Sequence, residues 1–441
     1  MIRRLVVLGA AAAAIVAVVA SGRIPVDPPV DAAPYAGEVT PAVQPLACPG
    51  PVEVPVGEID AGDPDLGSGS SDKTYQALGD GRSDAGAGFL ARADAAASVE
   101  RIGSGDVAGL AAATCLAPVR DQWLVGGSTS LGSSARLVLT NPTDASTEAT
   151  VTFYGALGPL EERSVVSIAP GGQQDLLLEG TVAEVPALVV RVSATGAGVV
   201  AHLQDSRLDG FQPAGTDWVG RGAAPATALV VPGVGAGADA TTTLRLMAPE
   251  GATADLTLVG DDGPVDWGGV SSLQLDPGVV TEVEVPQIDS GAIEIHADAP
   301  VVAAAMRSVP RPVTDGPAGA VERDLAWMPA QAVDGAEARS VVATDHVVAV
   351  TVHTASGGRF TLTDASGAVV AQQAMAAHTT ATLPVAVAAG TVLTAEGRFA
   401  WSLELEDDPG FVATLVPRAT GVETATVEVG QVPYVGPGAG S

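Results

Sequence analysis

The sequence predicts an all-β protein, with three tandem Ig-like antiparallel β-sandwich modules behind an irregular N-terminal cap. A hairpin motif recurs about every hundred residues, and short strand-like runs alternate with turn signals. Hydrophobic residues make up 47 % of the 441 residues while aromatic residues make up only 3 %, so the cores must be aliphatic. Regularly spaced short strands with frequent turn residues are typical of β-sandwiches.

The hairpin motif is clearest at 154–160 and 259–265, where two glycines flank a two-residue turn. A third copy at 363–369 keeps the second glycine and has Asp364 in place of the first. Tight hairpin turns need residues that tolerate positive φ, which explains the glycines. A β-propeller would require a repeat of about 40 to 50 residues, and the sequence does not show one. Duplicated sandwich modules are therefore the preferred architecture.

Composition and turn residues divide the chain into nine segments. Glycine-, proline- and alanine-rich stretches mark the links between modules, and a last strand is expected at Thr424–Val429. The predicted segments are a signal peptide or signal anchor (1–22), an extended linker (23–47), a cap (48–120), module 1 (121–208), a linker (209–226), module 2 (227–309), a linker (310–324), module 3 (325–418) and a C-terminal strand and tail (419–441).

The N-terminal segment predicts export. Arg3 and Arg4 precede an uncharged apolar run, Leu5 to Ala20, which has the pattern of a secretory signal. At 1.5 Å per residue this run spans about 24 Å as a helix, somewhat less than a hydrocarbon core of about 30 Å. A cleaved signal peptide is therefore slightly favoured over an uncleaved anchor. Either alternative places the rest of the chain outside the cytoplasm.

Cys48 and Cys115 are the only cysteines, and an exported chain favours a disulfide between them over two buried thiols. The bond would tie the cap to the modular body. Within the cap, 85–102 is the one segment whose apolar positions predict a helix, and 60–81 is expected to be disordered.

The charge excludes some classes of partner. The chain carries 51 acidic and 21 basic residues, a net charge of −30. Nucleic-acid binding depends on basic patches, so it is not expected, and anionic surfaces are disfavoured for the same reason.

No candidate catalytic or metal site stands out. The five histidines, including His202 and His296, form no zinc-binding spacing, and 60–67 lacks the glutamate that closes a calcium loop. The Gly126–Thr129 loop lacks the helix and lysine of a phosphate loop, so a turn is preferred. The sequence predicts no catalytic residue, no cofactor and no enzymatic activity.

The five tryptophans are the remaining hint, and two alternatives are open for them. Exposed indoles can stack on sugar rings, so Trp123, Trp218 and Trp267 are possible interaction residues. A tryptophan at a module boundary more often packs the junction, and Trp123 and Trp327 are expected to open modules 1 and 3. The fifth tryptophan is Trp401.

Several ordered motifs resemble one actinobacterial family of exported proteins of unknown function. These are Cys48-Pro49-Gly50, then Cys115 shortly before Asp121-Gln-Trp-Leu-Val-Gly-Gly127, then Leu137-Val-Leu-Thr-Asn-Pro142, and finally a pattern across 204–218. The resemblance is concentrated in the first half of the chain. It implies an extracytoplasmic location and supplies no catalytic residues.

The function expected from these observations is a non-catalytic, structural or protein-interaction role at the cell envelope. One alternative is a carbohydrate-binding protein that uses exposed tryptophans, and a second is a hydrolase with a site between modules. The expected partners are envelope proteins or wall polysaccharide, with no nucleic acid. Contact with the membrane is expected through the N-terminal segment if it is not cleaved.

Overall fold

A computed structural model describes most of the chain. The described residues are 35–39, 45–53, 69–73, 83–91, 96–210, 212–235, 239–268, 270, 272–313, 321–333, 339–408, 410–419 and 425–429. The predicted signal segment and most of 60–81 lie outside them. Residues 1–42 and 422–441 form one compact unit, and residues 43–421 form the other.

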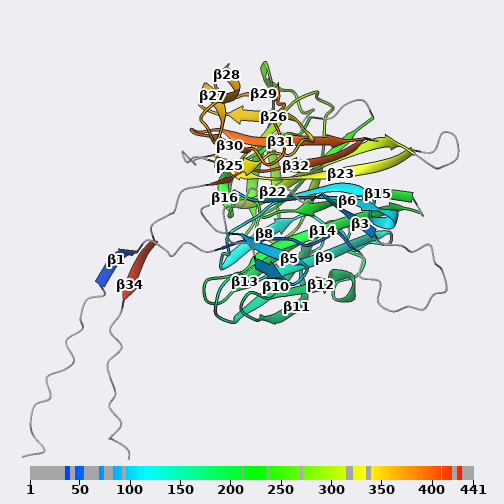
Figure 1. Cartoon of the computed structure of the whole chain (residues 1–441). Helices are drawn as coiled ribbons and strands as arrows, with labels where there is room; N and C mark the ends of the chain where they lie inside the picture. The colour runs from blue at the N-terminus through cyan, green and yellow to red at the C-terminus, as the bar shows by residue number, and fades with distance from the viewer. Residues whose placement is uncertain are drawn as a thin grey trace, which may run out of the picture. The chain divides into compact units, whose positions relative to one another are not determined.

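In the first unit, a strand from each end of the chain pairs antiparallel. These strands are β1 (Tyr35–Val39) and β34 (Ala425–Val429), which lie side by side in Figure 1. The C-terminal strand expected at Thr424–Val429 is therefore confirmed. Two paired strands, β1 and the start of the cap strand β2 (Leu46–Cys48), fall within the expected linker 23–47.

Module 1 is a sandwich of two four-stranded antiparallel sheets. The first sheet has the order β11-β10-β13-β8, and the second has the order β12-β9-β14-β15. The elements are β8 (Asp121–Val125), β9 (Ser133–Thr140), β10 (Thr147–Gly155), β11 (Gly158–Ile168), β12 (Gln173–Leu177), a 3₁₀ turn η2 (Leu178–Gly180), β13 (Val189–Ala194), β14 (Val200–Asp209) and β15 (Gln212–Val219).

Module 2 repeats this topology, except that one long strand serves both sheets. The first part of β22 pairs with β16 and β18, and its later part pairs with β17 and β23. The elements are β16 (Ala226–Pro232), β17 (Thr241–Met247), β18 (Ala252–Gly260), β19 (Gly263–Val265), β20 (Ser272–Leu275), β21 (Thr281–Val285), β22 (Ala292–Pro312), β23 (Val321–Pro329) and β24 (Gln331–Ala332).

Module 3 has sheets of order β28-β27-β30-β25-β33 and β29-β26-β31-β32. Its strands are β25 (Arg339–Val342), β26 (Val347–Thr354), β27 (Gly358–Asp364), β28 (Val369–Met375), β29 (Thr379–Pro384), β30 (Val392–Ala395), β31 (Ala400–Asp407), β32 (Phe411–Leu415) and β33 (Arg418–Ala419). The prediction of an all-β chain of antiparallel sandwich modules is confirmed. Each predicted hairpin motif forms a turn between two strands: β10 and β11, β18 and β19, and β27 and β28.

The cap consists of two three-stranded sheets, of order β2-β5-β4 and β3-β6-β7. The further elements are β3 (Gly69–Lys73), β4 (Ser83–Ala85), β5 (Gly88–Ala91), β6 (Ser98–Ser104), a 3₁₀ turn η1 (Gly105–Val107) and β7 (Gly109–Thr114). The helix predicted over 85–102 is wrong. Gly86, at φ 59°, turns the chain between β4 and β5, and β6 is paired along its length with β7. Sheet pairing thus overrides the local helical preference of this alanine-rich segment.

Strands also occupy part of each of the two linkers predicted between modules. Residues 212–219 form β15, which pairs with β14, and the 310–324 segment contains the end of β22 and the start of β23. Modules 1 and 2 therefore each contain an edge strand, β15 and β23, that lies in or begins in a predicted linker. Trp327 closes module 2 and does not open module 3.

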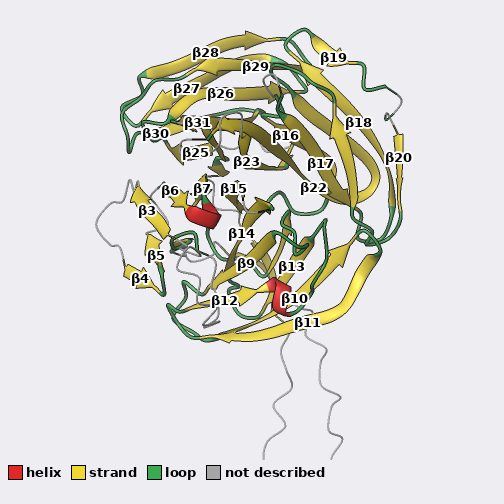
Figure 2. Cartoon of the chain, turned by 90° about the vertical axis from the view of Figure 1, so that its right-hand side faces the viewer, coloured by secondary structure: helices red, strands yellow, loops and turns green. Residues whose placement is uncertain are grey.

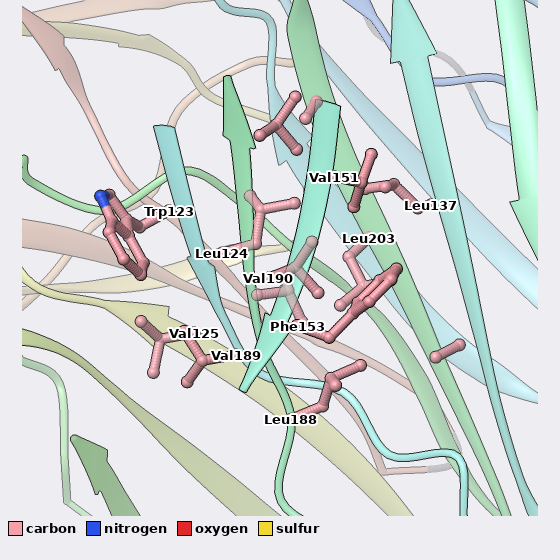
Figure 3. Packing of buried hydrophobic residues seen from close by; sticks show 14 of the residues in the cluster. Trp123, Leu124, Val125, Leu137, Val151, Phe153, Leu188, Val189, Val190 and Leu203 are labelled. Carbon is pink, nitrogen blue, oxygen red and sulfur yellow. The ribbon is translucent and has the colours of Figure 1, made fainter. Parts of the chain in front are cut away.

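Each module has its own aliphatic core. Figure 3 shows the core of module 1, where Leu137, Phe153, Val190 and Leu203 pack between the two sheets. Separate clusters fill modules 2 and 3, and a smaller one fills the cap around Cys48 and Cys115.

Candidate functional site

Four strands from four different parts of the body meet at one place, which we call the hub. They are β7 of the cap, β15 of module 1, β23 of module 2 and β32 of module 3. β7 contacts β15, β15 contacts β23, β23 contacts β32, and β32 contacts β7, so the four strands form a closed ring. Figure 2 shows β7, β15 and β23 near the centre of the body, with β11, β20 and β28 at its periphery. The hub therefore holds the parts of the body together.

Every hub strand lies at the edge of its own sheet and pairs with a single neighbour. The outer edge of such a strand carries backbone N–H groups without a sheet partner, and burying them unpaired is costly. Two aspartates in the hub accept hydrogen bonds from several of these groups.

Asp217 on β15 joins the cap to module 2. Its Oδ1 accepts the backbone N–H of Ala112 on β7 at 3.1 Å, and its Oδ2 accepts that of Trp327 on β23 at 2.7 Å. The side chain of Asp217 is fully buried. This one carboxyl group therefore contacts three of the four hub strands, counting its own.

Asp324 on β23 makes the corresponding connection to module 3. Its Oδ2 accepts the N–H groups of Leu110 on β7 at 3.2 Å and of Val412 on β32 at 2.9 Å. Together the two aspartates link all four hub strands through bonds between residues 88 to 214 positions apart.

Burial in the hub also raises the pKa of the carboxyl groups of Asp217 and Asp324. Burial raises the pKa of Asp324 to about 7. The hydrogen bonds that its carboxyl accepts from backbone N–H groups, and the charge of Arg311, act to lower the pKa and offset part of this increase. Burial raises the pKa of Asp217 well above its ordinary value, and the nearby carboxyl of Asp324 adds to this increase.

Two glycines allow the hub strands to approach one another closely. A Cβ atom on Gly109 would lie 2.5 Å from the backbone nitrogen of Thr216 and 2.8 Å from Oδ1 of Asp324. One on Gly215, which has φ 106°, would lie 2.5 Å from the nitrogen of Leu325. A methyl group at either position would push apart strands of different modules.

The tryptophans are buried in the structure. Trp123, Trp218, Trp267, Trp327 and Trp401 are between 1 % and 7 % exposed. The indole N–H of Trp327 donates to Oδ2 of Asp205 at 3.0 Å, while that of Trp267 donates to the carbonyl of Glu284 at 3.0 Å. The interpretation of Trp123, Trp218 and Trp267 as exposed sugar-stacking residues is therefore wrong.

Arg245 connects modules 1 and 2. Its guanidinium donates from Nη1 to the carbonyl groups of Gly127 at 2.7 Å and Leu188 at 2.9 Å, and it pairs with Glu282 of its own module at 2.8 Å. It also lies over the ring of Trp327, 5.1 Å from the centroid. Gly127 of the Gly126–Thr129 loop thus accepts a hydrogen bond across the boundary between modules 1 and 2.

The carboxylate of Glu294 connects modules 2 and 3. Its Oε1 lies 2.9 Å from Nε2 of His353 and 2.8 Å from Nδ1 of His378, while His296 lies 3.9 Å from Oε2. The side-chain hydrogen bonds of His353 and His378 lower the pKa of Glu294 and outweigh its burial. Within the described ranges, no group of three or more His, Cys, Asp and Glu is placed to hold a metal ion. The acidic segment 60–67 lies outside them.

The cap is held on two sides. Cys48 and Cys115 form the predicted disulfide. Buried Arg136 of module 1 pairs with Glu53 at 2.6 Å and Asp175 at 3.0 Å. On the side of module 3, Glu100 pairs with His346, and Thr114 donates to the carbonyl of Val416 at 2.6 Å. The cap therefore contacts both the first and the last module.

No sequence motif pointed to Asp205, Asp217 and Asp324 as important residues. One signal was present near the predicted linkers: an aspartate shortly before a tryptophan occurs at Asp217-Trp218 in the first linker and at Asp324-Leu-Ala-Trp327 where the second linker meets module 3. Large aromatic residues are unusual in solvated linkers, so Asp217-Trp218 indicated a buried strand.

Comparison with known proteins gives a family but no activity. No curated protein matches the chain. A solved structure described as "Biofilm associated protein - BSP domain" is 10 % identical over 83 % of this chain and 67 % of that one, with a TM-score of 0.15, a similarity too low to inform function. No helix among the described residues has the length and apolar character needed to cross a bilayer. Residues 74–394 match the family of unknown function DUF5719, and the chain belongs to that family.

Proposed function

We propose that this protein is a non-catalytic structural or protein-interaction component of the cell envelope. The observation that supports this most directly is the hub. Its buried aspartates accept hydrogen bonds from backbone N–H groups of neighbouring parts, and these hydrogen bonds hold the body together. A body closed in this way presents its outer strands and loops in a fixed arrangement, which suits a scaffold.

The disulfide and the expected signal segment support an extracytoplasmic location. A disulfide buried in the cap is consistent with an oxidising, extracytoplasmic compartment. We further propose secretion or anchoring by one N-terminal segment, and an actinobacterial source. The net charge of −30 favours partners other than nucleic acid.

The two alternatives have less support. Burial of the tryptophans removes the residues on which sugar binding depended. A hydrolase between modules would need free carboxylates there, but Asp217 accepts two backbone N–H groups and Asp205 accepts the Trp327 indole. We therefore favour a protein partner over a sugar, and a structural over a catalytic role.

The exposed apolar side chains offer positions at which to look for partners. Leu157, at the tip of the β10–β11 hairpin, is 98 % exposed, and Val369, at the start of β28, is 58 % exposed. A photo-crosslinking amino acid at either position should capture an envelope protein in the native cell. The matched control places the same amino acid at Phe153, which is buried in the core of module 1.

Fractionation of the same cells tests the location. We expect the chain in the membrane fraction or, if the signal is cleaved, in the medium with a mass lacking about the first 20 residues. Recovery in the cytoplasm with free thiols would contradict export. Crosslinks no different from those of the Phe153 control would contradict the interaction role.

A further inference from the structure

A small cavity lies beside the hub, where all four parts of the body contribute a wall. Its volume is about 60 Å³. Thr114 of β7, His202 of β14, Trp218 of β15, Trp327 of β23 and Thr414 of the β32 strand line it, together with Arg221 from the segment that follows β15. A cavity of this size has room for a few water molecules or one small organic ion.

Arg221 gives this cavity an uncompensated positive charge. Its Nη1 donates to the carbonyl oxygen of Ala117 at 3.0 Å, a neutral partner. Burial lowers the pKa of Arg221 to about 10, so the group remains charged at neutral pH. Arg136 and Arg245 are more fully buried than Arg221, but each pairs with a carboxylate. Among the described residues, no carboxylate forms an ion pair with Arg221.

The other walls favour an anion over a cation. Burial lowers the pKa of His202 to about 4, so this imidazole is neutral at pH 7, and Arg221 carries the one charge among the lining residues. The indole N–H of Trp218 is buried and has no acceptor among the described residues. Indole rings on two sides and a planar guanidinium on another suit a small planar anion, because guanidinium and carboxylate form two parallel hydrogen bonds.

We propose that this cavity binds a small carboxylate, about the size of acetate, through the guanidinium of Arg221. The bound carboxylate supplies the negative charge that no described side chain supplies to Arg221. The net charge of −30 repels anions at long range, but at physiological ionic strength that field is screened beyond about 8 Å. Contact with Arg221 therefore dominates. Since every part of the body lines the cavity, an occupant also stabilises their assembly.

Titration of the full-length protein with sodium acetate tests this, with tryptophan fluorescence and the unfolding temperature as readouts. Ionic strength is held constant with sodium chloride, and acetamide serves as the neutral isostere. We expect a saturable fluorescence change and a rise in unfolding temperature with acetate, and neither with acetamide. Arg221→Gln should weaken the apparent affinity at least tenfold.

Arg120→Gln is the matched control, because Arg120 also donates to a backbone carbonyl, that of Gly196 at 2.7 Å, on an exposed surface. It should respond to acetate as the unchanged protein does. Equal responses to acetate and acetamide, or an unchanged response in Arg221→Gln, would overturn the proposal. If Arg221→Gln fails to fold, Arg221→Lys replaces it. Lysine keeps the charge but loses the planar fork, so its affinity should fall, and an unchanged affinity would likewise overturn the proposal.

A short peptide with a free C-terminus, compared with its amide, distinguishes the source of the carboxylate. Binding of acetate alone supports a free small acid as occupant. Binding of the free peptide but not the amide supports the chain end of a protein partner. Binding of neither ligand would overturn the proposal.

Discussion

The module cores and the hub achieve stability by different means. The core of module 1 consists of aliphatic side chains such as Leu137, Val151 and Leu203 between two sheets. The hub instead relies on two buried aspartates and on two glycines that allow close contact. Aliphatic residues of similar volume can replace one another with little loss, because packing has no direction. A carboxylate that accepts two specific N–H groups cannot be replaced in this way.

This contrast indicates where the body is most sensitive to change. Each core is filled mainly by one module, with a few residues from a neighbouring part, whereas each hub aspartate holds strands from three parts. We therefore expect a core substitution to destabilise its own module first. A hub substitution should destabilise the cap and all modules together.

Asp217→Ala should have the largest effect. It leaves the buried N–H groups of Ala112 and Trp327 without acceptors, at roughly 1–3 kcal/mol each, so the free energy of unfolding should fall by about 4 kcal/mol. Urea denaturation measures this. The control is Asp121→Ala, which removes a surface ion pair with Arg191 and should cost less than about 1 kcal/mol. Equal effects in the two variants would refute the structural role of Asp217.

Loss of the disulfide should follow closely. The bond closes a loop of 67 residues, so Cys48→Ala with Cys115→Ala should lower stability by roughly 3–4 kcal/mol. Hydrogen exchange should show faster opening of β7 and, through it, of the hub. Reduction of the unchanged protein provides the control, because it should reproduce the result. Protection of β7 that stays the same in both samples would show that the hub does not depend on the cap.

Leu137→Ala tests the core side of the comparison. Leu137 is fully buried, and its truncation should cost about 3 kcal/mol through lost burial and the cavity left behind. Leu137→Met keeps the volume and should cost less than about 1.5 kcal/mol. Hydrogen exchange should increase first in module 1. A simultaneous increase in modules 2 and 3 would remove the distinction between core and hub.

The pH dependence of stability should also distinguish the hub from the cores, with a smaller effect than the substitutions above. Because the pKa of Asp324 rises from 3.8 to about 7 on folding, the folded state keeps a proton that the unfolded chain has lost. The stability from this group is therefore complete below about pH 3.8 and is lost as pH rises through 7. We expect a decrease on the order of 2 kcal/mol between pH 5 and 7.5.

Asp324→Asn provides the reference for that measurement, because asparagine has a similar shape and does not titrate in this range. His202, whose pKa burial lowers to about 4, changes stability in the opposite direction, but it is present in both proteins. The difference between the two curves therefore reports Asp324 together with the part of the Asp217 pKa shift that the Asp324 charge causes. Parallel curves from pH 5 to 7.5 would contradict the raised pKa.

The sequence by itself determined the parts of this protein whose signals are local. The hairpin glycines, the aliphatic runs and the even number of cysteines predicted the sandwich modules and the Cys48–Cys115 bond. These signals are readable because turn geometry and strand periodicity depend on neighbouring residues. Local preference misled only where pairing decided the outcome, as in the alanine-rich segment that forms β5 and β6.

Only the tertiary structure decided how the modules assemble. The strands β15 and β23 have the glycine, proline and acidic residues of linkers, so their composition hid their pairing with β14 and β22. The role of Asp217 and Asp324 depends on N–H groups about a hundred or more residues away in most cases. A buried carboxylate is stabilised by the partners that the fold brings to it, and those partners leave no mark beside it in the chain.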